Sequence, residues 1–127
     1  MGSLPPKDEH IYRVIHPGND FTIDNGGVSS AAFKDPRGLS VELQCGRTDR
    51  TVVSHIRKTK PQLKGKVAKI PVKVCDKFDI VIFNDKSRDV YHRLLLSANK
   101  PFDPEGNNSL SRSQARALAD NITALLV

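Results

Sequence analysis

The sequence of 127 residues contains no tryptophan, and aromatic residues make up only 6% of it. Proteins that hold single-stranded nucleic acid by stacking need several aromatic faces, so this scarcity weighs against a stacking platform. Only two cysteines, Cys45 and Cys75, are present, too few for a disulfide framework. No apolar run reaches membrane-spanning length, and residues 1–10 lack the apolar core of a secretory signal. We therefore expect a cytoplasmic protein with reduced thiols and no membrane partner.

Familiar motifs of metal and nucleotide chemistry are also missing. The four histidines are scattered, and no pair of histidines or cysteines has the spacing of a structural zinc site. The chain has no GxSxG nucleophile elbow and no GxxxxGKS or GxxxxGKT phosphate loop. Cys45, at a predicted strand end, is better explained as a small buried hydrophobic residue than as a nucleophile. On this basis we expect no metal and no cofactor.

Length and composition indicate one folded domain. With 38% hydrophobic and 27% charged residues, the chain can bury a core without metals or disulfides. Residues 1–9 are polar and include Pro5 and Pro6, which predicts a flexible tail before a single domain over residues 10–127.

Periodicity and β-branched content predict the strands. Residues 11–15, 39–43 and 90–96 fit half-buried strands, the last with a helical turn as the alternative. Residues 78–83 form the most apolar run and predict a central strand. Residues 28–33 fit a short strand or extended segment. Residues 63–74, around Pro71, fit either an irregular edge strand or a turn that leads into a helix.

Capping residues and apolar spacing predict two helices. Thr48 and Asp49 are good caps for a helix over residues 49–60. Ser111 and Gln114 form a capping-box pattern before a helix over residues 111–126, with Leu118 on its apolar face. The sequence therefore predicts an α+β domain, in which two helices cover a mixed or antiparallel sheet of four to five strands and the C-terminal helix packs on that sheet.

Positive charge is concentrated between Arg47 and Lys77. This segment has ten basic residues against two acidic ones, a local charge of about +8. We therefore predict a binding module whose basic surface contacts nucleic acid or an acidic protein, and we leave open a solvated lysine-rich face and a homo-oligomer. The predicted surface comprises Arg57, Lys58, Lys60, Lys64, Lys66 and Lys69.

A second hypothesis starts from the order of polar residues along the predicted strands. Arg13 lies on the first strand, Ser29 and Ser30 on the next segment, and Glu42 on the one after. An arginine fork suits a pyrophosphate, and a carboxylate can stabilise an oxocarbenium-like centre. For Arg13 alone, an ordinary position on an edge strand is the simpler interpretation.

This order resembles that of ADP-ribosyltransferases, and residues 11–14 are similar to the start of RES-type NAD-degrading toxins. The resemblance implies that Arg13 holds the phosphates of NAD, that Ser29 and Ser30 brace the nicotinamide pocket, and that Glu42 is catalytic. His92 or His16 would lie at the rim of the pocket. The alternative function is therefore an NAD- or nucleotide-using enzyme.

The stretch from Thr22 to Gly46 carries a further resemblance. Its SSAAFxDPxxLSV segment begins at Ser29 and resembles that of a family of small bacterial proteins, as do His92 before an apolar strand and the alanine-rich final helix. This resemblance implies a compact single domain and a bacterial source, and no particular activity. A purely structural role for the stretch, as a tight strand–turn–strand unit with Gly38 in the turn, is equally consistent with the sequence.

Overall fold

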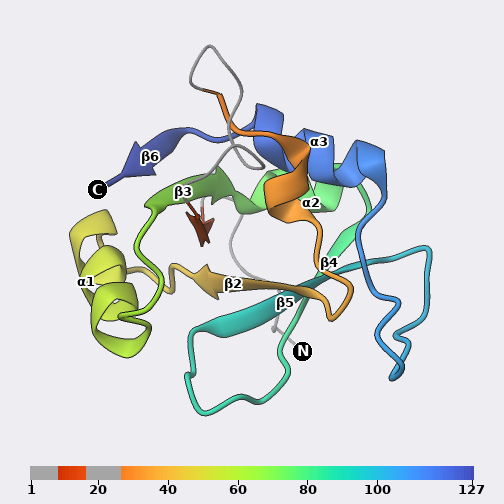
Figure 1. Cartoon of the computed structure of the whole chain (residues 1–127), viewed down its shortest axis with the longest axis horizontal. Coiled ribbons are helices and arrows are strands. Elements are labelled where there is room, and N and C mark those ends of the chain that lie inside the picture. The colour runs from red at the N-terminus through yellow and green to blue at the C-terminus, as the bar shows by residue number, and fades with distance from the viewer. Residues whose placement is uncertain (1–8, 17–26) are drawn as a thin grey trace.

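Six strands form one open antiparallel sheet in the order β4-β5-β2-β1-β3-β6 (Figure 1). The computed structural model describes residues 9–16 and 27–127. The elements are β1 (His10–Ile15), the 3-10 helix η1 (Ser30–Phe33), β2 (Leu39–Leu43), α1 (Asp49–Thr59), β3 (Lys66–Pro71), α2 (Val72–Lys77), β4 (Ile80–Phe83), β5 (His92–Ser97), α3 (Arg112–Asp120) and β6 (Ala124–Leu126).

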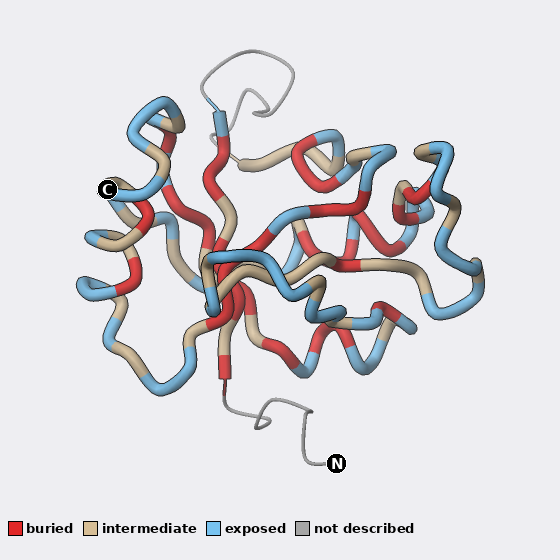
Figure 2. Tube along the Cα trace, turned by 90° about the horizontal axis from the view of Figure 1, so that it is seen from below, coloured by how far each residue is buried: buried red, intermediate tan, exposed pale blue. Residues whose placement is uncertain are grey.

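Side chains alternate between two cores, one on each face of the sheet. On one face, η1, α2 and α3 pack against the sheet around residues such as Ile11, Phe33 and Leu118. On the other face, α1 packs against Tyr12 and its neighbours. Figure 2 shows the buried segments gathered mainly toward the middle of the molecule and the exposed segments around its outside. No helix within the described residues is long and apolar enough to cross a membrane.

The two central strands diverge along their length. β1 pairs with β3 at all six of its residues, whereas its register with β2 comprises Ile11↔Leu43 and Tyr12↔Glu42. Beyond Tyr12, Arg13 bridges the widening gap: its Nη1 donates to the Ser40 carbonyl oxygen at 2.8 Å, and its Nε donates to that of Ala32 at 2.9 Å. Arg13 therefore lies on a central strand and ties η1 to β2.

The predicted α+β class is confirmed. Within the described residues, three α-helices accompany one antiparallel sheet of six strands. The capping box of Ser111 and Gln114 and the Thr48 cap are present as expected. Residues 28–33 were expected to be a short strand or an extended segment; Ser29 is extended, but its hydroxyl accepts from the Ala31 amide and starts η1, which takes up Ser30–Phe33.

Two further predictions need correction. The apolar run at residues 78–83 is not a central strand, since Phe78 closes α2 and only β4 follows, at the edge of the sheet. The C-terminal helix ends at Asp120, and the next residues pair with β3 as β6. Thr123 begins this change by donating its amide to the Lys69 carbonyl oxygen at 2.8 Å.

Candidate functional site

The most unusual polar group in the described chain is the carboxylate of Glu42, whose side chain is only 1% exposed. β2 directs it toward α1, and its Oε2 accepts from Arg47 Nη2 at 3.1 Å. Among the described residues its Oε1 has no hydrogen-bond partner, and Lys60 Nζ lies 3.9 Å away. Burial raises the pKa of Glu42, against the opposing influence of His55 and Arg47. A buried oxygen without a partner is costly, so Glu42 marks the candidate site.

Arg47 is locked beside Glu42 by several contacts. Its Nη2 also donates to the Leu43 carbonyl oxygen at 2.8 Å, and its Nε donates to that of Gln44 at 2.9 Å. The guanidinium lies 3.5 Å from the centre of the Tyr91 ring, a stacked cation–π contact. The turn between β2 and α1 permits this because Cys45 and Gly46 both have positive φ, 51° and 74°.

A histidine–aspartate pair completes the cluster. His55, on α1, has its Nε2 3.1 Å from Asp89 Oδ2, and the Tyr91 amide donates to Asp89 Oδ1 at 3.0 Å. The His55 ring meets the Tyr91 ring edge-on, with 5.2 Å between their centres. Glu42, His55 and Asp89 each offer one possible ligand atom, and these three atoms lie within 4.8 Å of one another. This set is the group in the described chain that could hold a metal ion.

A small cavity opens where β1 and β2 diverge beneath α1. Its volume is about 70 Å³, and its lining includes Tyr12, Ser40, Glu42 and Lys60. The space is large enough for a water molecule or a single small ion beside the Glu42 carboxylate.

Only part of the group that the sequence assigned to an NAD pocket comes together: Arg13, His16 and Glu42 line the same small cavity, whereas Ser29 and Ser30 lie at the start of η1. Tyr12 pairs with Glu42 across the strands, so the side chain of Arg13, the next residue of β1, points away from the Glu42 carboxylate although both residues line the cavity. The Arg13 guanidinium is committed to backbone carbonyl groups, and Ser29 serves as the N-cap of η1, immediately before Ser30.

His92 is the predicted partner that lies on β5, on the other side of β2 from Arg13. His92 and Glu42 pair directly between β2 and β5, and His92 Nδ1 lies 3.0 Å from Asp85 Oδ1. Arg47, His55, Asp89 and Tyr91 were missed. Arg47 lies in the turn after β2 and His55 on α1, whereas Asp89 and Tyr91 belong to the segment that the pairing of β2 with β5 brings to this place. Cys45 was predicted to be buried but is exposed, because it occupies the left-handed turn.

The predicted basic surface divides into internal and external residues. Arg57 donates to the carbonyl oxygens of Leu63 and Gly65, at 3.1 and 2.7 Å. Lys69 Nζ lies 2.9 Å from Asp49 Oδ1. By contrast, the three cations Lys58, Lys64 and Lys66 are exposed, and within the described residues no ion pair neutralises them.

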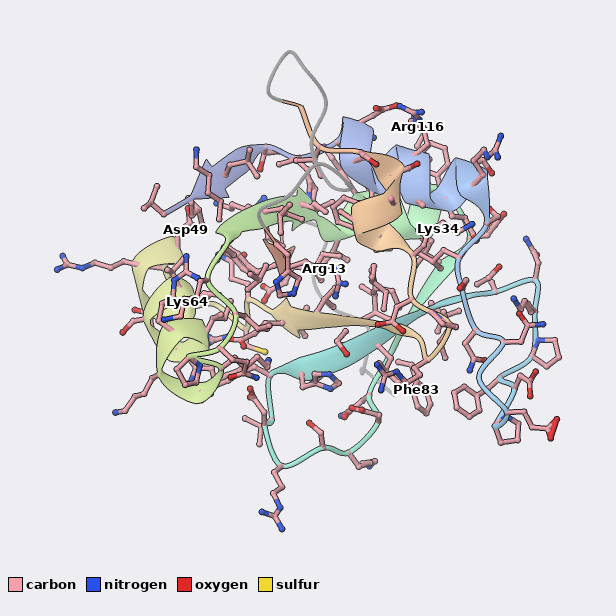
Figure 3. The ribbon with its side chains drawn as sticks, viewed as in Figure 1. Arg13, Lys34, Asp49, Lys64, Phe83 and Arg116 are labelled. Carbon is pink, nitrogen blue, oxygen red and sulfur yellow. The ribbon has the colours of Figure 1, made fainter. Side chains whose placement is uncertain are left out.

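A larger cleft lies on the opposite side of the sheet, between α2 and the start of α3. It has a volume of about 570 Å³, and Lys34, Lys77 and Lys100 line it together with Ser111. Figure 3 shows Lys34 beside α2 and Lys64 beside α1, on different sides of the molecule.

Comparison of the chain with protein-family models, with curated proteins and with solved structures finds no match in any of the three.

Proposed function

We propose that this protein binds nucleic acid through the surface formed by Lys58, Lys64 and Lys66, here called the α1 basic surface. The observation that carries the proposal is the unneutralised charge of these three lysines. The nearby carboxylates are already engaged: Asp49 by Lys69, and Glu42 by Arg47. Exposed lysines without a neutralising carboxylate attract phosphate groups, and contact between the two releases counterions from the nucleic acid.

The α1 basic surface is held together by the fold. Arg57 binds two carbonyl groups of the loop after α1, so this loop, which carries Lys64, stays close to the end of the helix. No acidic residue occurs in the sequence from Arg50 to Cys75. Because aromatic residues are few, contact with the phosphate backbone of a duplex suits this surface better than stacking on single-stranded bases.

The test is fluorescence anisotropy with labelled duplex RNA and duplex DNA over a range of salt concentrations. The variant Lys58→Glu/Lys64→Glu/Lys66→Glu is compared with a control that lies on α2 and α3, Lys73→Glu/Arg112→Glu/Arg116→Glu. The three control positions are also exposed, and both variants change the formal net charge of +6 by the same amount.

The first variant should weaken binding at least tenfold and lower the salt slope by about 0.9 per lost phosphate contact. The control should retain most of the affinity. Equal losses in both variants would mean that overall charge, not this surface, governs binding. No binding of the unmodified protein to either duplex would exclude the proposal.

A second candidate function, binding of a small phosphorylated ligand, is favoured by the cleft between α2 and α3. Lys34, Lys77 and Lys100 reach this cleft from three separate segments. We therefore place the candidate nucleotide site in this cleft and not around Arg13 and Glu42. Millimolar ATP, NAD or pyrophosphate should raise the melting temperature, because a ligand of the folded state stabilises it by mass action. Lys34→Ala/Lys77→Ala should abolish the rise, and no rise with any of the three would exclude this candidate.

A further inference from the structure

We propose that Glu42, His55 and Asp89 form a binding site for a divalent transition-metal ion, with Zn²⁺ as the best fit. One nitrogen and two carboxylate oxygens, from β2, α1 and the loop before β5, lie within 4.8 Å of one another. His55 Nε2 and Asp89 Oδ2 are 3.1 Å apart. Two ligands that each lie about 2.1 Å from a zinc ion are separated by about 3.0–3.4 Å, so this pair already has the required spacing.

The unpartnered oxygen of Glu42 is an independent observation that points to a ligand. The side chain is 1% exposed, so bulk water does not solvate Oε1, and no hydrogen bond within the described residues compensates it. A metal ion bound by this oxygen would remove the cost of burying it.

In each carboxylate, a protein donor already holds one oxygen. Arg47 binds Oε2 of Glu42, and the Tyr91 amide binds Oδ1 of Asp89. Such outer contacts orient metal ligands and tune their affinity. Here they form one packed unit, because Arg47 stacks on the Tyr91 ring and that ring meets the edge of His55.

Lys60 is the competitor for this site. Its Nζ lies 3.9 Å from Glu42 Oε1, beyond hydrogen-bond distance, and its side chain is 29% exposed. The ammonium group can therefore swing into solvent when a metal ion binds, but its positive charge opposes that ion. Removal of the charge should strengthen metal binding, whereas a purely structural ion pair would show no such gain.

The donor set selects among metals. Imidazole with two carboxylates and no sulfur suits zinc, iron and manganese, and the general order of affinity places Zn²⁺ above Mn²⁺. Mg²⁺ and Ca²⁺ prefer oxygen ligands throughout, so the imidazole disfavours them. We therefore expect Zn²⁺ to bind more tightly than Mn²⁺, and Mg²⁺ not to compete.

The experiment is calorimetric titration of the chelator-treated full chain with Zn²⁺ and Mn²⁺. All measurements use a Cys45→Ser background, because the exposed thiol of Cys45 could itself bind zinc. The test variants are His55→Gln and Asp89→Asn. Asp85→Asn is the matched control, since Asp85 pairs with His92 at 3.0 Å in a similar arrangement outside the proposed ligand set. Thermal unfolding establishes that each variant is folded.

One Zn²⁺ should bind per chain, and both test variants should weaken it at least about tenfold, by analogy with the loss of ligand support in metal sites. Asp85→Asn should change affinity less than about twofold, and Lys60→Gln should increase it. Absence of one-to-one zinc binding, or an equal loss with Asp85→Asn, would overturn the proposal. An unchanged or weaker affinity with Lys60→Gln would overturn the assignment of Glu42 Oε1 as a ligand.

Discussion

Replacement of Arg47 with methionine is expected to destabilise the fold by about 3–5 kcal/mol at neutral pH, the range for removing one partner of a buried ion pair. The pair is well shielded, because the side chains of Arg47 and Glu42 are 11% and 1% exposed. Methionine keeps an apolar side chain beside the Tyr91 ring but removes the only donor that Glu42 Oε2 has in the described structure. The expected loss therefore comes mainly from an uncompensated buried carboxylate.

The loss should depend on pH with a defined sign. Burial raises the pKa of Glu42 above the usual value of 4.5, and without Arg47 it should rise further. The folded state then holds the Glu42 proton more tightly than the unfolded state does. The resulting stability is fully present below the unfolded pKa and is lost as pH rises through the folded pKa. The variant should consequently lose less stability at about pH 5 than at about pH 7.5.

Urea unfolding followed by circular dichroism at the two pH values measures this difference. The double variant Glu42→Gln/Arg47→Met is the control, because a neutral side chain at position 42 should recover stability at the higher pH and remove the difference between the two conditions. A loss below about 1 kcal/mol, or an equal loss at both pH values, would refute the reasoning.

Three further predictions, one of them with a matched control variant, test the packing. Leu118→Ala should cost about 2–5 kcal/mol in urea unfolding because Leu118 is fully buried, whereas Leu125→Ala, at a residue that is 36% exposed, should cost less than about 1 kcal/mol. Gly65→Ala should cost about 1–3 kcal/mol, because its Cβ would overlap the carbonyl oxygen of Ile15; equal stability would mean that this approach is looser than the structure shows. Gln114→Leu should lower the melting temperature, because it leaves two backbone carbonyl groups at the end of α2 without their side-chain donor; an unchanged value would mean that water replaces the amide.

Local patterns in the sequence predicted the strands and caps that depend on near neighbours. A high content of β-forming residues identified β1, alternation identified β2, and a capping box identified the start of α3. The end of α3 was not predictable in this way, because Ile122 and Leu125 continue the helical spacing. The chain changes to β6 since the edge of β3 offers hydrogen-bond partners there, and that edge exists only in the folded sheet.

The candidate site shows the same division between local and distant information. Glu42 was singled out from the order of polar residues on successive strands, and Arg13 does line the same cavity, but its guanidinium binds backbone carbonyl groups. His55 and Asp89 carry no motif that links them to Glu42. They meet it because α1 covers the sheet and because β5 lies beside β2, which brings the loop before β5 to the same place. Sequence motifs for metal sites are based on ligand spacing, so they detect only ligands that lie close together in the sequence.

The divergence of β1 from β2 divides the sheet into two sets of three strands, β4-β5-β2 and β1-β3-β6, that share a short seam. A protein opens first where few hydrogen bonds must break, so amide exchange in β2 at this seam should be faster than exchange between β1 and β3. Glu42 lies on one side of the seam, and Tyr12 lies opposite it. A ligand that joins Glu42 to α1 and the loop before β5 would make partial opening of the sheet less favourable. Amide exchange in β2 would then slow without any change in the folded shape.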